Sequence, residues 1–266
     1  MARSALLLDV TVEGCDVELY VNDIPLVRIP AAAGGGMHQC DHVLVPGPNV
    51  FEVLLHPGAT PSVARTDKRT LPSAGIAVEV HAALCPPGTA PGEVGTTTLF
   101  RFGERLPGGP LEFPRSVQAT HPIDRTEGPW AWERATVLQL DPTLLYEATR
   151  FVQSMHASLA RKSFVGFWAH NEIAHREVAR AFDVPLSERQ AAGEAALNSQ
   201  FADPAFAMAP LVAEQFDYRL VAGGRLLECI AKDWGAIVRT EPDSEGHVMR
   251  FPIMLGRLDG VLRGLR

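Results

Sequence analysis

The chain has few of the features that mark nucleic-acid-binding or membrane-spanning proteins. Its 24 basic residues are outnumbered by 31 acidic ones, which gives a formal charge of −7. Phosphate backbones are bound by clustered positive charge, and no basic run occurs, so we expect no nucleic-acid partner. No apolar run approaches the roughly 18 residues that a membrane-spanning helix needs, so we expect no membrane partner either.

Cysteine is scarce and scattered. The four cysteines are far apart and form no CxxC pair: Cys15, Cys40, Cys85 and Cys229. Asp9 and Glu13 interrupt the apolar run at the start of the chain, which therefore lacks the hydrophobic stretch of an export signal. We expect reduced, mostly buried thiols and a cytoplasmic protein.

Motifs that fix a reaction or a cofactor are also missing. The glycines at 34–36 are followed by no P-loop lysine, and neither GxSxG nor HExxH occurs. Glu172 and His175 have the ExxH spacing of carboxylate-bridged metal sites. Helical phasing, however, places Glu172 opposite the buried face, and no second such motif exists to complete a site. We therefore expect no metal and no cofactor.

The first half of the chain has the pattern of an antiparallel β-sandwich. Its β-prone segments are residues 4–12, 16–21, 24–29, 41–45, 50–56, 74–84 and 96–102. Turn signals such as Asn22-Asp23 separate neighbouring segments. We expect the sandwich domain to cover residues 1–140, with residues 103–130 as a Pro/Gly-rich loop or linker.

Two segments of this sandwich have a recognisable order. Residues 20–25 read YVNDIP, and residues 45–53 read VPGPNVFEV. An Asn-rich hairpin followed by a Pro-Gly-x-Asn turn resembles the jelly-roll sugar-binding domain appended to some glycoside hydrolases. Asp23 departs from that family, which usually has Gly there. The resemblance implies a jelly-roll-like fold, and it carries over no sugar-binding residue.

Trp130 and Trp132 stand at the end of the predicted loop. Two neighbouring indoles are possible surface-binding aromatics that could stack on a sugar ring. They could equally hold the loop against the protein, because aromatic side chains bury large areas. Burial is the simpler interpretation.

A helical region follows. Asp141 supplies an N-cap acceptor and Pro142 a first helical residue. Apolar residues then recur on one helical face: Leu144, Ala148, Phe151, Val152, Met155 and Leu159. Gly166 precedes a second helix, and Asp203-Pro204 ends a third. The last part of the chain alternates apolar and polar residues, and Gly223-Gly224 marks a hairpin.

Helices followed by an antiparallel meander predict an α+β domain over residues 141–266. This order, together with the ending FPIMLGRLDG at residues 251–260, resembles the cystatin-like cone superfamily, which includes nuclear transport factor, ketosteroid isomerase and polyketide cyclase relatives. Members usually place a strand pair or another helix before the meander, and no clear equivalent is present. The whole chain is thus expected to be α+β, with a jelly-roll-like sandwich followed by a cone.

Five residues are candidates for lining a pocket in the second domain. His170 and Glu177 share one helical stripe directed toward the packed side, where ionisable groups must pair or line a cavity. The cone resemblance adds candidates, because its isomerases need a carboxylate base and hydrogen-bond donors inside the cone. It implies that Asp217, Tyr218 and Glu228 could supply them.

Three functions compete. The first is a binding or interaction protein without catalytic activity, whose partner is a small molecule or a protein and which could form homo-oligomers. The second is a cofactor-free isomerase or cyclase with an acid/base pair such as His170 and Asp217. The third is a carbohydrate-binding module acting through the sandwich. We favour the first, because the sequence alone assembles no nucleophile–base pair, phosphate loop or metal set.

Overall fold

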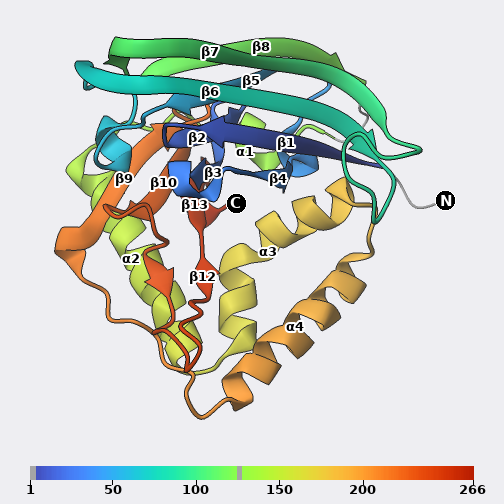
Figure 1. The fold of residues 1–266 in the computed structure, drawn as a ribbon. Helices are drawn as coiled ribbons and strands as arrows, with labels where there is room; N and C mark the ends of the chain where they lie inside the picture. The colour runs from blue at the N-terminus through green and yellow to red at the C-terminus, as the bar shows by residue number, and fades with distance from the viewer. Residues whose placement is uncertain (1–3, 125–127) are drawn as a thin grey trace. The chain divides into compact units, whose positions relative to one another are not determined.

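The computed structural model describes residues 4–124 and 128–266, in two compact units, Met1–Gly128 and Pro129–Arg266 (Figure 1). Residues 1–3 and part of the predicted loop, residues 125–127, lie outside the described part. The predicted α+β class is confirmed: antiparallel strands come first, followed by helices and then by further antiparallel strands.

Two four-stranded antiparallel sheets form the N-terminal unit. Sheet A has the strand order β4-β1-β6-β7, and sheet B has the order β3-β2-β5-β8. The strands are β1 Ala5–Glu13, β2 Val17–Val21, β3 Ile24–Ile29, β4 Gly35–Gln39, β5 Gly47–Leu55, β6 Arg69–Cys85, β7 Thr97–Phe113 and β8 Arg115–Ile123. Short 3-10 helices lie at Ala31–Ala33, Asp41–Val43 and Pro61–Val63.

The core of this unit lies between the two sheets. Along β1 the apolar residues Leu6, Leu8 and Val10 are fully buried, and the residues between them are half-buried. A strand alternates its side chains between two faces, so this pattern defines an inner and an outer face of sheet A. The ring of Phe51 in sheet B lies 4.7 Å from that of Phe100 in sheet A, which shows the inner faces in contact.

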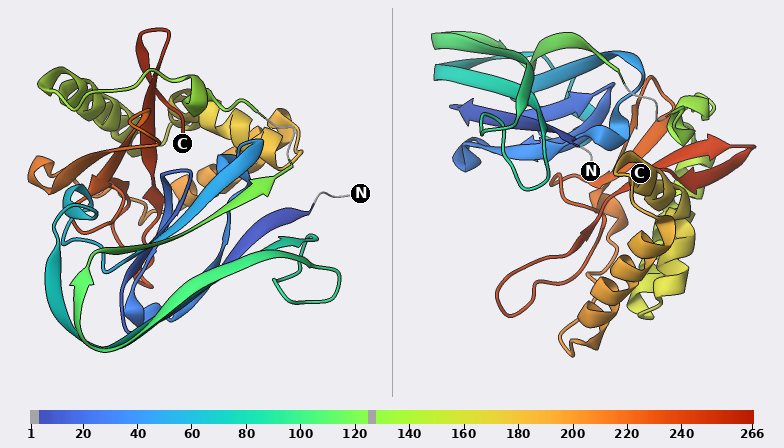
Figure 2. Two further views of the ribbon diagram at one scale, coloured as in Figure 1. Left: turned by 90° about the horizontal axis from the view of Figure 1, so that it is seen from above. Right: turned by 90° about the vertical axis from the view of Figure 1, so that its right-hand side faces the viewer.

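The loop predicted at residues 103–130 is the main error of the sequence reading. Most of it belongs to β7 and β8, and β6 and β7, each 17 residues long, pair as an antiparallel hairpin (Figure 2). Pro107 and Pro110 are tolerated because β7 is an edge strand, where a missing N–H costs no ladder bond. The strand predicted at residues 41–45 is also wrong. There the Asp41 carboxylate accepts the Leu6 amide at 2.9 Å, and the backbone forms a 3-10 helix.

The side chains of two asparagines join the hairpin at residues 20–25 to the Pro-Gly turn that begins at residue 45. Asn22 and Asp23 both have positive φ, 53° and 63°, as a two-residue hairpin turn requires. The fully buried Asn49 accepts the Val45 amide and donates to the Val45 carbonyl, both at 2.8 Å. Asn22 donates to Asn49 Oδ1 at 2.8 Å. The two side chains therefore fix the hairpin against the Pro-Gly turn.

Replacing Asn49 by alanine is expected to destabilise the N-terminal unit by about 2 kcal/mol, since half-buried backbone groups of the turn lose their partners. Urea unfolding followed by circular dichroism measures this change. The matched control is Asn198→Ala, at an exposed helical position. Equal stability of the two variants would contradict this role for Asn49.

The C-terminal unit packs helices on one face of a four-stranded antiparallel sheet. Its helices are α1 Ala131–Arg134, α2 Pro142–Ala160, α3 Phe164–Ala181 and α4 Leu186–Ala202. Its strands are β9 Phe216–Val221, β10 Leu226–Ala231, β11 Val238–Arg239, β12 Arg250–Phe251, β13 Ile253–Leu258 and β14 Val261–Gly264, and Ala213–Gln215 form a 3-10 helix. The main sheet has the order β14-β13-β10-β9, while β11 and β12 form a separate pair.

The predicted helical stripe forms the core of this unit. Leu144, Val152 and Leu159 of α2 are buried in one cluster with Leu227 of β10 and Leu255 of β13. The Asp141 carboxylate accepts the Leu144 amide at 2.8 Å, so the predicted N-cap is confirmed. No helix in the described ranges is long and apolar enough to cross a membrane.

The boundary between the units falls earlier than the predicted one at residue 140. Residues 131–140, predicted to belong to the sandwich domain, instead begin with the short helix α1 and belong to the C-terminal unit. There Thr136 bridges to Arg257 of β13, and the Leu138 amide donates to the Gly224 carbonyl at 2.8 Å. Pairing with C-terminal strands therefore assigns this segment to the second unit.

Candidate functional site

His170 and Glu177, the two predicted residues on α3, have separate surroundings. His170 is half-buried and lines a depression of about 220 Å³, together with Phe151 and Arg263 among others. Glu177 is buried, accepts a hydrogen bond from the Ala131 amide, and lies 3.6 Å from a guanidinium nitrogen of Arg266. The two residues therefore do not form one cavity.

The Glu177 and Arg266 pair is a buried ion pair. Burial raises the pKa of Glu177, although Arg266, the Ala131 amide and Arg180 oppose this shift. Burial lowers the pKa of Arg266 to about 10, against the attraction of Glu177. The guanidinium also lies over the Trp130 ring, 5.6 Å from its centre. These contacts join α1, α3 and the end of the chain, which is a structural role.

Asp217, Tyr218 and Glu228 do not lie together either. The Tyr218 hydroxyl bonds to Thr149 of α2 at 2.8 Å, so Tyr218 points to the helix-covered face of the sheet. Its neighbour Asp217 therefore points to the other face, and its carboxylate accepts the Tyr218 amide at 3.0 Å. Glu228 pairs with Arg219 on that same face. A single interior pocket cannot contain all three side chains.

Trp130 and Trp132 are not surface-binding aromatics. Trp130 has no exposed surface and Trp132 is 8 % exposed. The Arg180 guanidinium lies 4.3 Å from the Trp130 ring centre and further covers it. Both residues lie in the C-terminal unit and not in the sandwich. A sugar-stacking platform at these two residues is therefore excluded, and burial was the correct interpretation.

In α3, Glu172 lies opposite the buried face of the helix, as predicted for the ExxH pair of Glu172 and His175. Glu172 is exposed and bonds to Arg176 one turn later at 2.5 Å. His175 instead stacks on Trp168, with ring centres 4.4 Å apart. The two side chains thus have different partners. Within residues 4–124 and 128–266, no three His, Cys, Asp or Glu side chains gather as a metal site would require.

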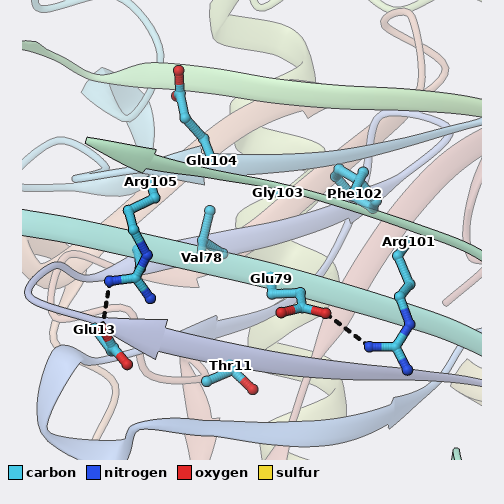
Figure 3. Close-up of a pocket in the computed structure, with 10 residues that line it drawn as sticks. Thr11, Glu13, Val78, Glu79, Arg101, Phe102, Gly103, Glu104 and Arg105 are labelled. Carbon is cyan, nitrogen blue, oxygen red and sulfur yellow. Dashed lines mark hydrogen bonds and ion pairs between the residues drawn. The ribbon is translucent and has the colours of Figure 1, made fainter.

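The outer face of sheet A carries a set of charged side chains that sequence reasoning missed. Across the strands, Thr11 of β1, Glu79 of β6 and Gly103 of β7 form one row. In the next row, Ala77 of β6 separates Glu13 of β1 from Arg105 of β7. Because residues directly opposite in a sheet share a face, these side chains lie on one surface (Figure 3).

Two small residues determine how the charges pair. Gly103 offers Glu79 no opposing side chain, and Glu79 accepts from Arg101 on the diagonal at 2.8 Å. Arg105 reaches across Ala77 to Glu13 at 3.4 Å (Figure 3). A side chain at Gly103 would not fit, because its Cβ would lie 2.2 Å from the Val78 carbonyl oxygen. Gly103 and Ala77 are therefore the floor between two ion pairs.

This charged face, which we define as Thr11, Glu13, Glu79, Arg101 and Arg105, is hollowed. It borders an open depression of about 460 Å³. A second depression, of about 540 Å³, continues along β6 and β7 beside Pro107 and shares the Glu13 and Arg105 side chains. The four charged side chains are between 56 % and 76 % exposed. The result is an open groove along sheet A that combines four charged side chains with apolar ones such as Val78 and Leu106.

The sequence did contain a signal for this face. Phe100, Phe102 and Leu106 are apolar and alternate with the outward positions 101, 103 and 105, as in a strand with one inner face. In the structure every second residue from Phe100 to Leu106 is indeed less exposed than its neighbours. Arg101 and Arg105 are the outward members of that alternation. Treating residues 103–130 as a loop concealed the pattern.

Comparisons with models of protein families, with curated proteins and with solved structures find no match for this chain.

Proposed function

We propose that the chain is a cytoplasmic binding protein that docks a partner polypeptide on the charged face of sheet A. The observation that carries the proposal is the groove itself, in which two ion pairs flank a floor of Ala77 and Gly103. Its open shape suits an extended chain better than a small molecule, because small-molecule sites usually enclose their ligand.

The spacing of the two arginines suggests what the partner carries. Arg101 and Arg105 are four residues apart on β7, which corresponds to about 13 Å along a strand. Two acidic side chains at the same interval on an extended segment would face both guanidinium groups. The partner would also need donors for Glu13 and Glu79, so we infer a segment of mixed charge with paired acidic residues.

The exposure of the two ion pairs makes it easy for charged groups of such a partner to replace one member of each pair. All four groups are more than half exposed, and exposed ion pairs contribute no more than about 1 kcal/mol to stability. A ligand can therefore replace one ion-pair partner at small cost. Charge complementarity of this kind mainly sets specificity and association rate.

Reversing both arginines, in the variant Arg101→Glu/Arg105→Glu, is expected to weaken peptide binding by about tenfold or more. Peptides would be selected from a displayed random library on the wild-type protein, and their affinities measured by fluorescence anisotropy. Binding to the wild type should also weaken as salt is added, since exposed charges are screened.

The matched control is Arg150→Glu/Arg250→Glu, which reverses two exposed arginines of the C-terminal unit. It should bind the selected peptides as the wild type does. Selected peptides that bind the sheet-A variant with unchanged affinity would refute this proposal. So would a library that yields no binder enriched on the wild type over that variant.

The second candidate function, a cofactor-free enzyme in the C-terminal unit, is favoured by one observation. His170 lines a depression, as a catalytic base must. The pair of His170 with Asp217 is not supported, because Asp217 lies on the sheet face away from the helices. Acid/base chemistry at His170 would therefore use groups that lie beside it, which come from α2, α3 and β14.

A further inference from the structure

The partner of His170 is a serine on the neighbouring helix. The Ser154 hydroxyl of α2 lies 3.0 Å from His170 Nε2, and His170 Nδ1 lies 2.7 Å from the Gly166 carbonyl oxygen. A carbonyl oxygen can only accept, so Nδ1 carries the hydrogen. In the neutral imidazole Nε2 then presents its lone pair, and Ser154 donates to it.

The sequence produces this pair through a close approach of α2 and α3. A Cβ atom at Gly166 would lie 2.7 Å from Ser158 Oγ, so only glycine lets the helices come this near. Ser154 is one turn before Ser158, and His170 is one turn after Gly166. In two antiparallel helices, one turn along each brings the next pair of residues together. The tight contact therefore sets the distance between Ser154 and His170.

The imidazole is also held from its other side. The Phe151 ring meets it edge-on, with centres 5.1 Å apart. His170 further lines the 220 Å³ depression, whose walls include Ile173 and Leu262 and which contains the cation Arg263. Glu172 at the same depression is paired with Arg176. His170 thus lies between an exposed serine hydroxyl and a small, partly apolar depression that is also lined by Glu172 and Arg263.

We infer that Ser154 is a nucleophile activated by His170, and that the pair hydrolyses esters of short-chain acids. Nucleophile, base and an orienting acceptor within hydrogen-bond reach are the arrangement that such catalysis requires. Here the orienting acceptor is the Gly166 carbonyl. The depression that His170 lines, of about 220 Å³, has room for a small acyl group of roughly the size of a benzene ring, and Arg263 also lines it.

The reaction is balanced by water alone. Ser154 Oγ attacks the acyl carbonyl carbon and its proton passes to His170 Nε2. The ester C–O bond breaks, and the leaving alcohol takes the proton from His170. Water then attacks the acyl-serine, His170 again accepts the proton and returns it to Ser154 Oγ, and the carboxylic acid is released. No oxidation or reduction occurs, so no further reactant is needed.

The test is hydrolysis of p-nitrophenyl acetate together with labelling by a fluorophosphonate, located by peptide mass spectrometry. Labelling is expected at Ser154. Ser154→Ala should abolish it, and His170→Gln should lower both labelling and hydrolysis about tenfold or more. Gly166→Ala keeps the carbonyl that orients His170 but pushes α2 and α3 apart, and should lower both rates as well.

The control Ser199→Ala, at an exposed position on α4, should leave both rates unchanged. Tryptophan fluorescence verifies that each variant is folded. Labelling at another residue, or Ser154→Ala hydrolysing at the wild-type rate, would overturn the assignment. This result is independent of peptide binding on sheet A, because the two sites belong to different units.

Discussion

The variant Arg266→Met is expected to destabilise the C-terminal unit by about 3 kcal/mol, because it removes the buried cation beside the Glu177 carboxylate and leaves the more exposed Arg180, 4.0 Å away, as its nearest guanidinium group. Only about 8 % of the Glu177 side chain is exposed, and Arg266 is the basic residue with the largest effect on it. Tryptophan fluorescence in a urea titration measures the loss selectively. All four tryptophans, Trp130, Trp132, Trp168 and Trp234, lie in this unit.

The double variant Glu177→Met/Arg266→Met distinguishes a charge effect from a packing effect. Removing both charges should cost less than the sum of the single changes, since no unpaired charge remains buried. Arg263→Met, at an exposed position on β14, is the matched control and should change stability by less than about 0.5 kcal/mol. Additive costs of the two single changes would contradict the buried ion pair.

Lowering the pH from about 7 to about 4 is expected to cost the C-terminal unit about 2–3 kcal/mol through His175 alone. Burial, together with Arg189 of α4, lowers the pKa of His175 from 6.5 to about 4. In the unfolded chain the imidazole takes up a proton below about pH 6.5, whereas in the folded unit it does so only near pH 4. Stability is therefore lost progressively as the pH falls between these two values.

His175→Phe keeps an aromatic ring against Trp168 and removes the titration. Its unfolding free energy should fall by about 2–3 kcal/mol less than that of the wild type over the same pH interval. His247→Gln, whose side chain is 73 % exposed, serves as the control and should behave as the wild type. If His175→Phe lost as much stability on acidification as the wild type, His175 would not be the group responsible.

Periodicity predicted the elements whose side chains alternate between core and solvent. The α2 stripe around Val152 was found because its burial follows the helical period, and β1 was found because its burial follows the strand period. Prolines misled the prediction of β7, since Pro107 breaks a central strand and is harmless at an edge. Whether a strand is central or at an edge depends on the whole sheet, and a single segment does not contain that information.

The candidate sites, too, could be predicted only in part from the sequence, which indicates the face of a residue but not its distant partners. Helical phasing correctly placed Glu177 on the buried side of α3 and Glu172 on the exposed side. It could not supply the partners of Glu177, because Arg266 and Ala131 come from distant segments that only tertiary packing brings near. The Ser154 partner of His170 depends similarly on the approach of α2 and α3 at Gly166.

The most direct test of polypeptide binding on sheet A is a nitrogen–proton correlation spectrum of the protein, recorded with and without a selected peptide. The account predicts that the largest shifts occur at the amides of Thr11, Glu79 and Gly103, which form one row across the charged face. Shifts concentrated in the C-terminal unit, with these three amides unchanged, would contradict it.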